Sequence, residues 1–197
     1  PIAYWVGGDT GLKQTTKMKW SGLSITAEEL AAIVPIPEAV IADSGIPIWP
    51  EVMPRLASAL GYKLDQATLF GVDKPSSFPD GIIPQAIAAH NTLTQGKDLA
   101  KDVASMGQKL AEQGFAMNGF ASKPGLNWEL IGLRNANGSP IYVPSLASGA
   151  PSTLYGFGLN EVDNGAWDTT KAVLLGADWS NFVVGIRQDI TYKLLDQ

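Results

Sequence analysis

One histidine, His90, is the first residue in this sequence that could carry acid–base chemistry. It stands in the run Ile87-Ala88-Ala89-His90-Asn91, and the chain holds one histidine and no cysteine. Metal sites of the usual kind draw several ligands from these two residue types, so no metal site is expected. A histidine in a loop or at a helix end is far more common than a lone catalytic base. We therefore predict no catalytic role for His90 and no metal ligand.

Two other patterns that resemble catalytic or cofactor-binding motifs are incomplete. Gly156-Phe157-Gly158-Leu159 begins like a dinucleotide-binding fingerprint but lacks the third glycine. The acidic pairs Glu28-Glu29 and Glu161 near Asp163 are close neighbours in sequence, which a solvated surface explains. The chain contains neither a phosphate-binding P-loop nor a Gly-x-Ser-x-Gly elbow. We predict a protein that is not an enzyme and needs no cofactor.

Lysines alternate with aromatic residues near the start of the chain. Gly7-Gly8-Asp9 and the alternation Lys17-Met18-Lys19-Trp20 are typical of an extended two-stranded excursion around a turn. Such a face could bind phosphate, or it could be a hairpin that contacts another subunit, and we favour the second. The candidate subunit-interface residues are Trp5, Lys13, Lys17 and Trp20.

Composition limits the classes of protein that remain. The 197 residues are 45% hydrophobic and 17% charged, with 21 glycines, 13 prolines and a net charge of −5. That balance predicts a globular chain with many turns and much surface that meets other protein. The acidic charge argues against a basic nucleic-acid-binding face. No apolar run is long enough for a membrane span, no signal peptide is visible, and nothing indicates an oxidising compartment.

The elements that organise the chain begin with a long helix predicted over residues 46–70. Its apolar residues recur at steps of three and four, Pro50 suits a first turn, and Gly71 is a natural stop. Pro54 interrupts the pattern and predicts a kink or a later start. The apolar residues of the stripe are Ile48, Val52, Leu56, Ala59, Leu60, Leu64, Ala67 and Phe70.

The remaining elements mix helices and strands without regular alternation, which favours an α+β fold. Residues 24–34 are ambiguous, because Thr26 and Glu29 form a capping-box pattern while Ile33-Val34-Pro35-Ile36 is rich in strand formers. Residues 37–42 suggest one or two helical turns. Further helices are predicted over 98–113 and 126–134. Short strands are predicted over 115–120, 141–143, 154–159, 172–177, 182–186 and 190–195.

The order of these segments resembles the major capsid proteins of tailed bacteriophages, the Hong Kong 97-type fold. The resemblance is carried by the run from Ala31 to Ser44, the long helix, Leu69-Phe70-Gly71, and Phe78-Pro79-Asp80-Gly81-Ile82. Three later runs resemble the family as well. They are Asn137-Gly138-Ser139-Pro140-Ile141-Tyr142, Ser152-Thr153-Leu154-Tyr155-Gly156, and Leu175-Gly176-Ala177-Asp178-Trp179 followed by Val184-Gly185-Ile186-Arg187.

The resemblance implies a domain organisation. Residues 1–20 would be part of an extended loop that reaches over a neighbouring subunit. Residues 21–80 with 181–197 would form the peripheral domain around the spine helix, and residues 81–180 the axial domain. The resemblance also implies a strand over 24–34. The chain starts and stops within ordered-looking sequence, so we expect a fragment of a longer product, in which the missing ends promote assembly.

The function that the resemblance implies is a structural subunit of a phage or prophage shell. The subunit would assemble with itself into pentamers and hexamers of an icosahedral capsid around double-stranded DNA, without sequence-specific binding. Scaffold, protease and portal proteins are further partners implied for the virion, which would be assembled in the host cytoplasm. Gly158 replaces the family's usual proline, and Ile83-Pro84-Gln85 offers no counterpart to the cross-linking lysine of some members. An encapsulin-like compartment and a small hydrolase or ligand-binding domain, with a cleft near His90 or Gly156, are the alternatives.

Overall fold

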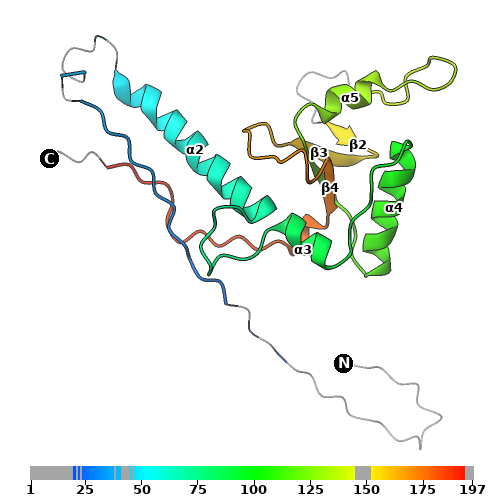
Figure 1. Ribbon diagram of the computed structural model, residues 1–197, viewed down its shortest axis with the longest axis horizontal. Helices are drawn as coiled ribbons and strands as arrows, with labels where there is room; N and C mark the ends of the chain where they lie inside the picture. Colours follow the sequence, from blue (N-terminus) through cyan, green and yellow to red (C-terminus); the bar gives the residue numbers. More distant parts are fainter. Residues whose placement is uncertain are drawn as a thin grey trace, which may run out of the picture.

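The computed structural model describes residues 20, 22, 24–37, 39–40, 45, 47–144 and 152–193. A mixed four-stranded sheet with helices on both faces forms one part of the molecule (Figure 1). A long helix and two extended segments form the other part (Figure 1). This arrangement confirms the predicted α+β class.

The long helix, α2, spans Ile48–Phe70 and ends at Gly71, whose φ of 68° is left-handed. Glycine adopts this conformation at no steric cost, so the predicted stop is confirmed. Pro54 lies inside the helix, which begins at Ile48, so the later start we expected is wrong. Pro54 lies on the exposed face of α2 and removes only one N–H group from the i to i−4 hydrogen bonds. The 23-residue helix therefore continues through Pro54 to Phe70.

Three shorter helices surround the sheet. Helix α3 spans Ile82–Ala88, α4 spans Leu99–Glu112 and α5 spans Leu126–Gly132. The carboxylate of Asp98 accepts hydrogen bonds from the backbone N–H groups of Ala100 and Lys101, and so fixes the start of α4. The predicted helix at 98–113 is confirmed with each end shifted by one residue, and the helix at 126–134 is confirmed with its C-terminal end shifted by two.

The sheet has the strand order β2-β3-β1-β4. The strands are β1 (Gly119–Ser122), β2 (Thr153–Leu154), β3 (Phe157–Glu161) and β4 (Leu174–Ala177). Strand β1 pairs parallel with β3 and antiparallel with β4, while β2 and β3 form an antiparallel hairpin. A 3₁₀ turn, η1 (Trp179–Asn181), follows β4.

Two hydrophobic clusters cover the two faces of the sheet. One joins α4 and α5 to Phe120 of β1, and the other joins the end of α2 and α3 to Ala121, the next residue of β1. Alternate side chains of a strand point to opposite faces, which explains why neighbouring residues belong to different clusters. The edge of Trp167 packs on Phe70 in the second cluster, with ring centroids 5.7 Å apart.

Several predicted strands are wrong. Residues 24–34 are extended but form neither the strand nor the helix considered for them, and residues 182–186 and the described part of 190–195 are extended as well. The predicted strand at 141–143 is absent, and the strand at 115–120 is replaced by β1 at 119–122. A strand requires a hydrogen-bonded partner, and among the described residues these segments have no partner strand.

Around residues 37–42, the structure describes Ala39 and Val40 as helical, and residues 41–44 lie outside the described part of the chain. The N–H of Val40 donates to the carbonyl of Pro37 at 3.0 Å. This contact fits the short helical turn predicted after Pro37.

Candidate functional site

His90 lies just beyond the end of α3, as expected for a helix-end histidine. Its φ of 56° is left-handed, and its backbone carbonyl accepts a hydrogen bond from Nζ of Lys109 at 3.3 Å. The residue is exposed, and it does not line the cavity to which the next residue, Asn91, contributes. His90 therefore belongs to the backbone turn that follows α3.

The glycines of the incomplete dinucleotide motif belong to the turn between β2 and β3. Tyr155 and Gly156 have φ values of 51° and 85°, which are typical of the two central residues of a tight hairpin turn. Gly158 then pairs within the sheet with Gly119 and Thr153. These residues connect two strands, and the next element in the described chain is strand β4 rather than a helix that could bind a pyrophosphate.

The acidic residues noted in the sequence are dispersed. Glu28 and Glu29 are exposed on an extended segment, as expected for a solvated face. Glu161 is different, because its carboxylate accepts a hydrogen bond of 2.6 Å from the backbone N–H of Asn127 at the start of α5. A carboxylate at this position satisfies a free N–H and complements the positive end of the helix. Within the described ranges, no group of three or more His, Cys, Asp and Glu residues could hold a metal ion.

The strongest pKa effects arise in local turns and one exposed ion pair. The hydroxyl of Ser180 donates to the carboxylate of Asp178 at the start of η1 and lowers the pKa of Asp178. A hydrogen bond of 2.6 Å between Lys63 and Asp73 raises the pKa of Lys63 and lowers that of Asp73. Thr170 lowers the pKa of Asp168 in the same way. Each shift favours the ordinary charged form, as expected for structural contacts.

Of the four candidate interface residues, the structure describes one. Trp20 is 88% exposed, while Trp5, Lys13 and Lys17 lie outside the described residues. An exposed tryptophan is a residue type that is enriched in contacts between chains. The interface role of all four residues stays a prediction.

Exposed apolar side chains gather on the two extended segments, residues 24–37 and 182–193, which we call the arm surface. In Figure 1 these segments run beside each other along α2. Ile25 and Ala27 of the first segment border a shallow hollow together with Gly185 and Ile186 of the second. The large apolar side chains exposed on the arm surface are Ile25, Leu30, Ile33, Val34, Phe182, Val183, Val184, Ile186, Ile190 and Tyr192.

A second group, which we call the tip surface, consists of Trp128, Ile141, Val143 and Tyr155. All four side chains are exposed, Trp128 by 74%. The segments that carry them are joined by Tyr142, whose hydroxyl lies 3.3 Å from Oδ1 of Asn127 and donates to the carbonyl of Thr153 at 2.7 Å. Trp128 is not among the candidate residues selected from the sequence, and the available signal is its place in the short helix predicted over 126–134.

The described part of the chain leaves many large apolar side chains exposed, both on the arm surface and on the tip surface. Large apolar patches on a soluble chain mark surfaces that meet other protein. The geometry therefore describes a chain with large exposed apolar surfaces. None of the described helices is long and apolar enough to cross a membrane.

Comparison with known structures gives strong matches. A structure from Microbacterium phage Oxtober96 is 40% identical, with a TM-score of 0.78, over 90% of this chain and 62% of the other. A structure from Mycobacterium phage Bobi is 33% identical, with a TM-score of 0.80, over 97% of this chain and 65% of the other. A structure from Mycobacterium phage Adephagia is 31% identical, with a TM-score of 0.74, over 90% of this chain and 59% of the other. The chain thus spans a little under two thirds of the length of these structures.

The comparison also bears on the alternatives. No curated protein is significantly similar to the chain. The three structures above come from phages, and they give no support to an encapsulin-like compartment or to a small hydrolase. At the level of sequence families, residues 1–197 match the Phage capsid family. The family match over the whole length, the similar phage structures and the exposed apolar surfaces agree, and the chain belongs to the phage capsid family.

Proposed function

We propose that this chain is the structural subunit, or the larger part of it, of an icosahedral phage or prophage shell around double-stranded DNA. The observation that carries the proposal is the arm surface, in which apolar side chains extend into solvent along two segments that have no partner strand among the described residues. Val184 is 80% exposed and Ile33 is 85% exposed. Membership of the phage capsid family supports a structural role rather than an enzymatic one.

Burial of the arm surface would contribute favourable free energy to assembly of the subunit. Burial of apolar area stabilises an interface by about 25 cal/mol per Å², before the cost of ordering the partners. Obligate interfaces bury about 2,000–5,000 Å² and are more apolar than other protein surfaces, and the arm surface is apolar along both of its segments. Copies related by symmetry would cover such surfaces repeatedly, as the pentamers and hexamers of a shell do.

The charge of the chain suits a container for DNA. A net charge of −5 disfavours tight binding to the phosphate backbone, so packaged DNA would be enclosed without sequence-specific contacts. Scaffold, protease and portal proteins are the further partners that we propose for the complete virion. Assembly would take place in the host cytoplasm.

We further propose the domain division expected from the sequence. The four strands of the sheet and helices α3, α4 and α5 all fall within residues 81–180, the proposed axial domain. Helix α2 and the described parts of both extended segments fall within residues 21–80 and 181–197, the proposed peripheral domain. Residues 1–20, with Trp5, Lys13, Lys17 and Trp20, would reach a neighbouring subunit.

A matched pair of variants tests the proposal in the protein expressed from the complete gene. Ile186→Ser places a hydroxyl on the arm surface, and Ile87→Ser makes the same change at an exposed site on α3. Multi-angle light scattering should show large assemblies for the wild type and Ile87→Ser, and small species for Ile186→Ser. Circular dichroism checks that both variants fold. Equal assembly of the two variants would contradict a role for the arm surface.

A further inference from the structure

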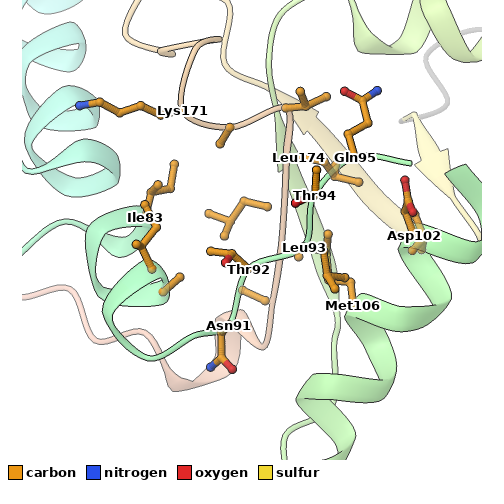
Figure 2. A pocket seen from close by; sticks show the side chains of 18 of the residues that line it. Ile83, Asn91, Thr92, Leu93, Thr94, Gln95, Asp102, Met106, Lys171 and Leu174 are labelled. Carbon is orange, nitrogen blue, oxygen red and sulfur yellow. The ribbon is translucent and has the colours of Figure 1, made fainter. Parts of the chain in front are cut away.

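A cavity of about 480 Å³ lies between α3 and α4, at the edge of the sheet where β4 ends the strand order. Its walls are largely apolar, with Ile83 from α3, Met106 from α4 and Leu174 from β4 (Figure 2). The segment from Asn91 to Gln95, which we call the strap, also lines the cavity and runs between Ile83 and Met106 in Figure 2. The strap belongs to the connection between α3 and α4, which pack on opposite faces of the sheet, so it must pass around the edge formed by β4.

Both ends of the strap are fastened to α4. At its start, the side-chain amides of Asn91 and Gln113 exchange hydrogen bonds of 3.2 and 2.9 Å, and Nζ of Lys109 donates to the carbonyl of Thr92 at 3.1 Å. Just beyond its end, the backbone N–H of Gly96 donates to the carboxylate of Asp102 at 2.7 Å. The strap therefore runs along α4 from its C-terminal end towards its N-terminal end.

The middle of the strap has backbone groups without a hydrogen-bond partner among the described residues. Among the described residues, the backbone of Leu93, Thr94 and Gln95 makes no hydrogen bond, and Leu93 is 40% exposed. Threonine is a strand-forming residue, and Thr92-Leu93-Thr94 alternates polar and apolar side chains as a half-buried strand does. The strap thus has the sequence of a strand without the pairing of one.

The open edge of β4 faces the strap across the cavity. The carbonyls of Val173 and Ala177 accept hydrogen bonds from Lys123 and Asn118, on the side of β1. Backbone groups alternate along an antiparallel strand, so those of Leu174 and Gly176 point away from β1, towards the free edge. Six residues connect the C-terminal end of α4 to Gly119, which pairs with Ala177 at the end of β4, so β4 runs towards the C-terminal end of α4 and antiparallel to the strap.

We propose that the strap closes onto the free edge of β4 and adds a fifth, antiparallel strand to the sheet, with Leu93 moving into the cavity. The hydrogen bonds that fasten the ends of the strap to α4 stay in place, and the unpaired residues between them move. His90, with its left-handed φ, is the hinge on the α3 side. The closed state covers the open sheet edge and fills the apolar cavity from within the same chain.

Disulfide trapping tests this closure directly, because the chain contains no cysteine of its own. Thr92→Cys and Thr94→Cys are each combined with Ala177→Cys, which covers two neighbouring strand registers. A disulfide requires Cα atoms about 4.4–6.8 Å apart, a separation that paired strands provide. Under mild oxidation of the full chain, more than half of the molecules of one pair should form the intramolecular disulfide. Thr92→Cys with Ser139→Cys, in the turn after α5, is the control and should stay reduced.

Two results of the trapping experiment would overturn the proposal. One is the absence of an intramolecular disulfide in both pairs. The other is a disulfide-linked dimer whose yield rises with protein concentration, which would make a second copy the occupant of the edge.

Hydrogen exchange followed by NMR gives an independent measurement without cysteines. In the wild type, the amides of Leu174 and Gly176 should exchange at least tenfold more slowly than in Thr94→Pro, since proline cannot join a strand ladder in full. The amide of Leu175, which faces β1, should change little and reports that the sheet remains intact. Equal exchange at Leu174 and Gly176 in both proteins would refute closure. Neither experiment depends on shell assembly, so closure and the proposed function can fail separately.

Discussion

Two glycine-to-alanine substitutions should change stability in opposite directions, although the chemical change is the same. Gly81, at the start of α3, lies against the end of α2, where an added Cβ would overlap the backbone N of Gly71 and sit 2.7 Å from the carbonyl carbon of Phe70. Gly61 lies in the middle of α2, and its added Cβ would have no atom within 4 Å.

The expected magnitudes follow from these surroundings. Overpacking costs about 1–3 kcal/mol. At Gly81 the clash also disturbs the N–H of Gly71, which donates to Ala67 at 2.9 Å and ends α2, and that bond contributes about 0.5–1.5 kcal/mol. Gly81→Ala should therefore lower the free energy of unfolding by about 2–4 kcal/mol. Gly61→Ala should raise it by about 1 kcal/mol, because alanine is the better helix former.

Equilibrium unfolding in urea, followed by circular dichroism and tryptophan fluorescence, measures both changes. Trp167 is a suitable local reporter, because its ring packs on Phe70 next to Gly71. The two variants should differ by about 3–5 kcal/mol, the sum of the two opposite effects. A Gly81→Ala variant as stable as the wild type would refute the close packing of α2 and α3. A Gly61→Ala variant that is less stable would refute the open surroundings of Gly61.

Three further predictions concern the core and the charged groups. Phe120→Ala empties a fully buried site and should lower the free energy of unfolding in urea by about 3–5 kcal/mol; a loss below 1 kcal/mol would place Phe120 outside the core. Because its lowered pKa lies below the ordinary 3.8, the cap of Asp178 stabilises the folded state fully above pH 3.8 and is lost as the pH falls through the folded pKa. Asp178→Asn should remove this acid dependence from thermal unfolding, and an unchanged pH profile would argue against the cap. Lys63→Gln should let the pKa of Asp73 rise towards 3.8 in an NMR titration, whereas an unmoved pKa would exclude the ion pair in solution.

The long helices of this chain could be predicted from local sequence. The apolar spacing and Gly71 define α2 within two residues, and Asp98 marks the start of α4 through its side-chain cap. These signals are read within a few residues of one another, because the hydrogen bonds of a helix are local. Pro54 misled the prediction of the start of α2, since a single missing N–H on an exposed face is tolerated.

The strands were harder to predict, because their existence depends on partners that are remote in sequence. Residues 154–159 look like one strand, but Tyr155 adopts a left-handed φ and divides the run into the β2–β3 hairpin. Residues 24–34 and 182–186 contain strand-forming residues, and the described chain offers them no partner strand. Their apolar side chains stay exposed for the same reason.

The same difference between local and remote information applies to the candidate functional site. The prediction that His90 and the acidic residues have no catalytic or metal-binding role rests on residue types alone. The arm and tip surfaces could not be predicted in this way, because exposure is a property of the folded chain. Trp128 shows the difficulty, since its helix buries Leu126 and Leu130 and leaves the tryptophan between them in solvent. Nothing in the local spacing distinguishes the three.

The most direct test of the proposed function is electron microscopy of the protein purified after expression of the complete gene in bacteria. The proposal predicts closed, icosahedral shells built from this subunit, with the arm surface covered by neighbouring copies. Small, monodisperse particles of one or two subunits, over a range of salt and protein concentrations, would contradict it.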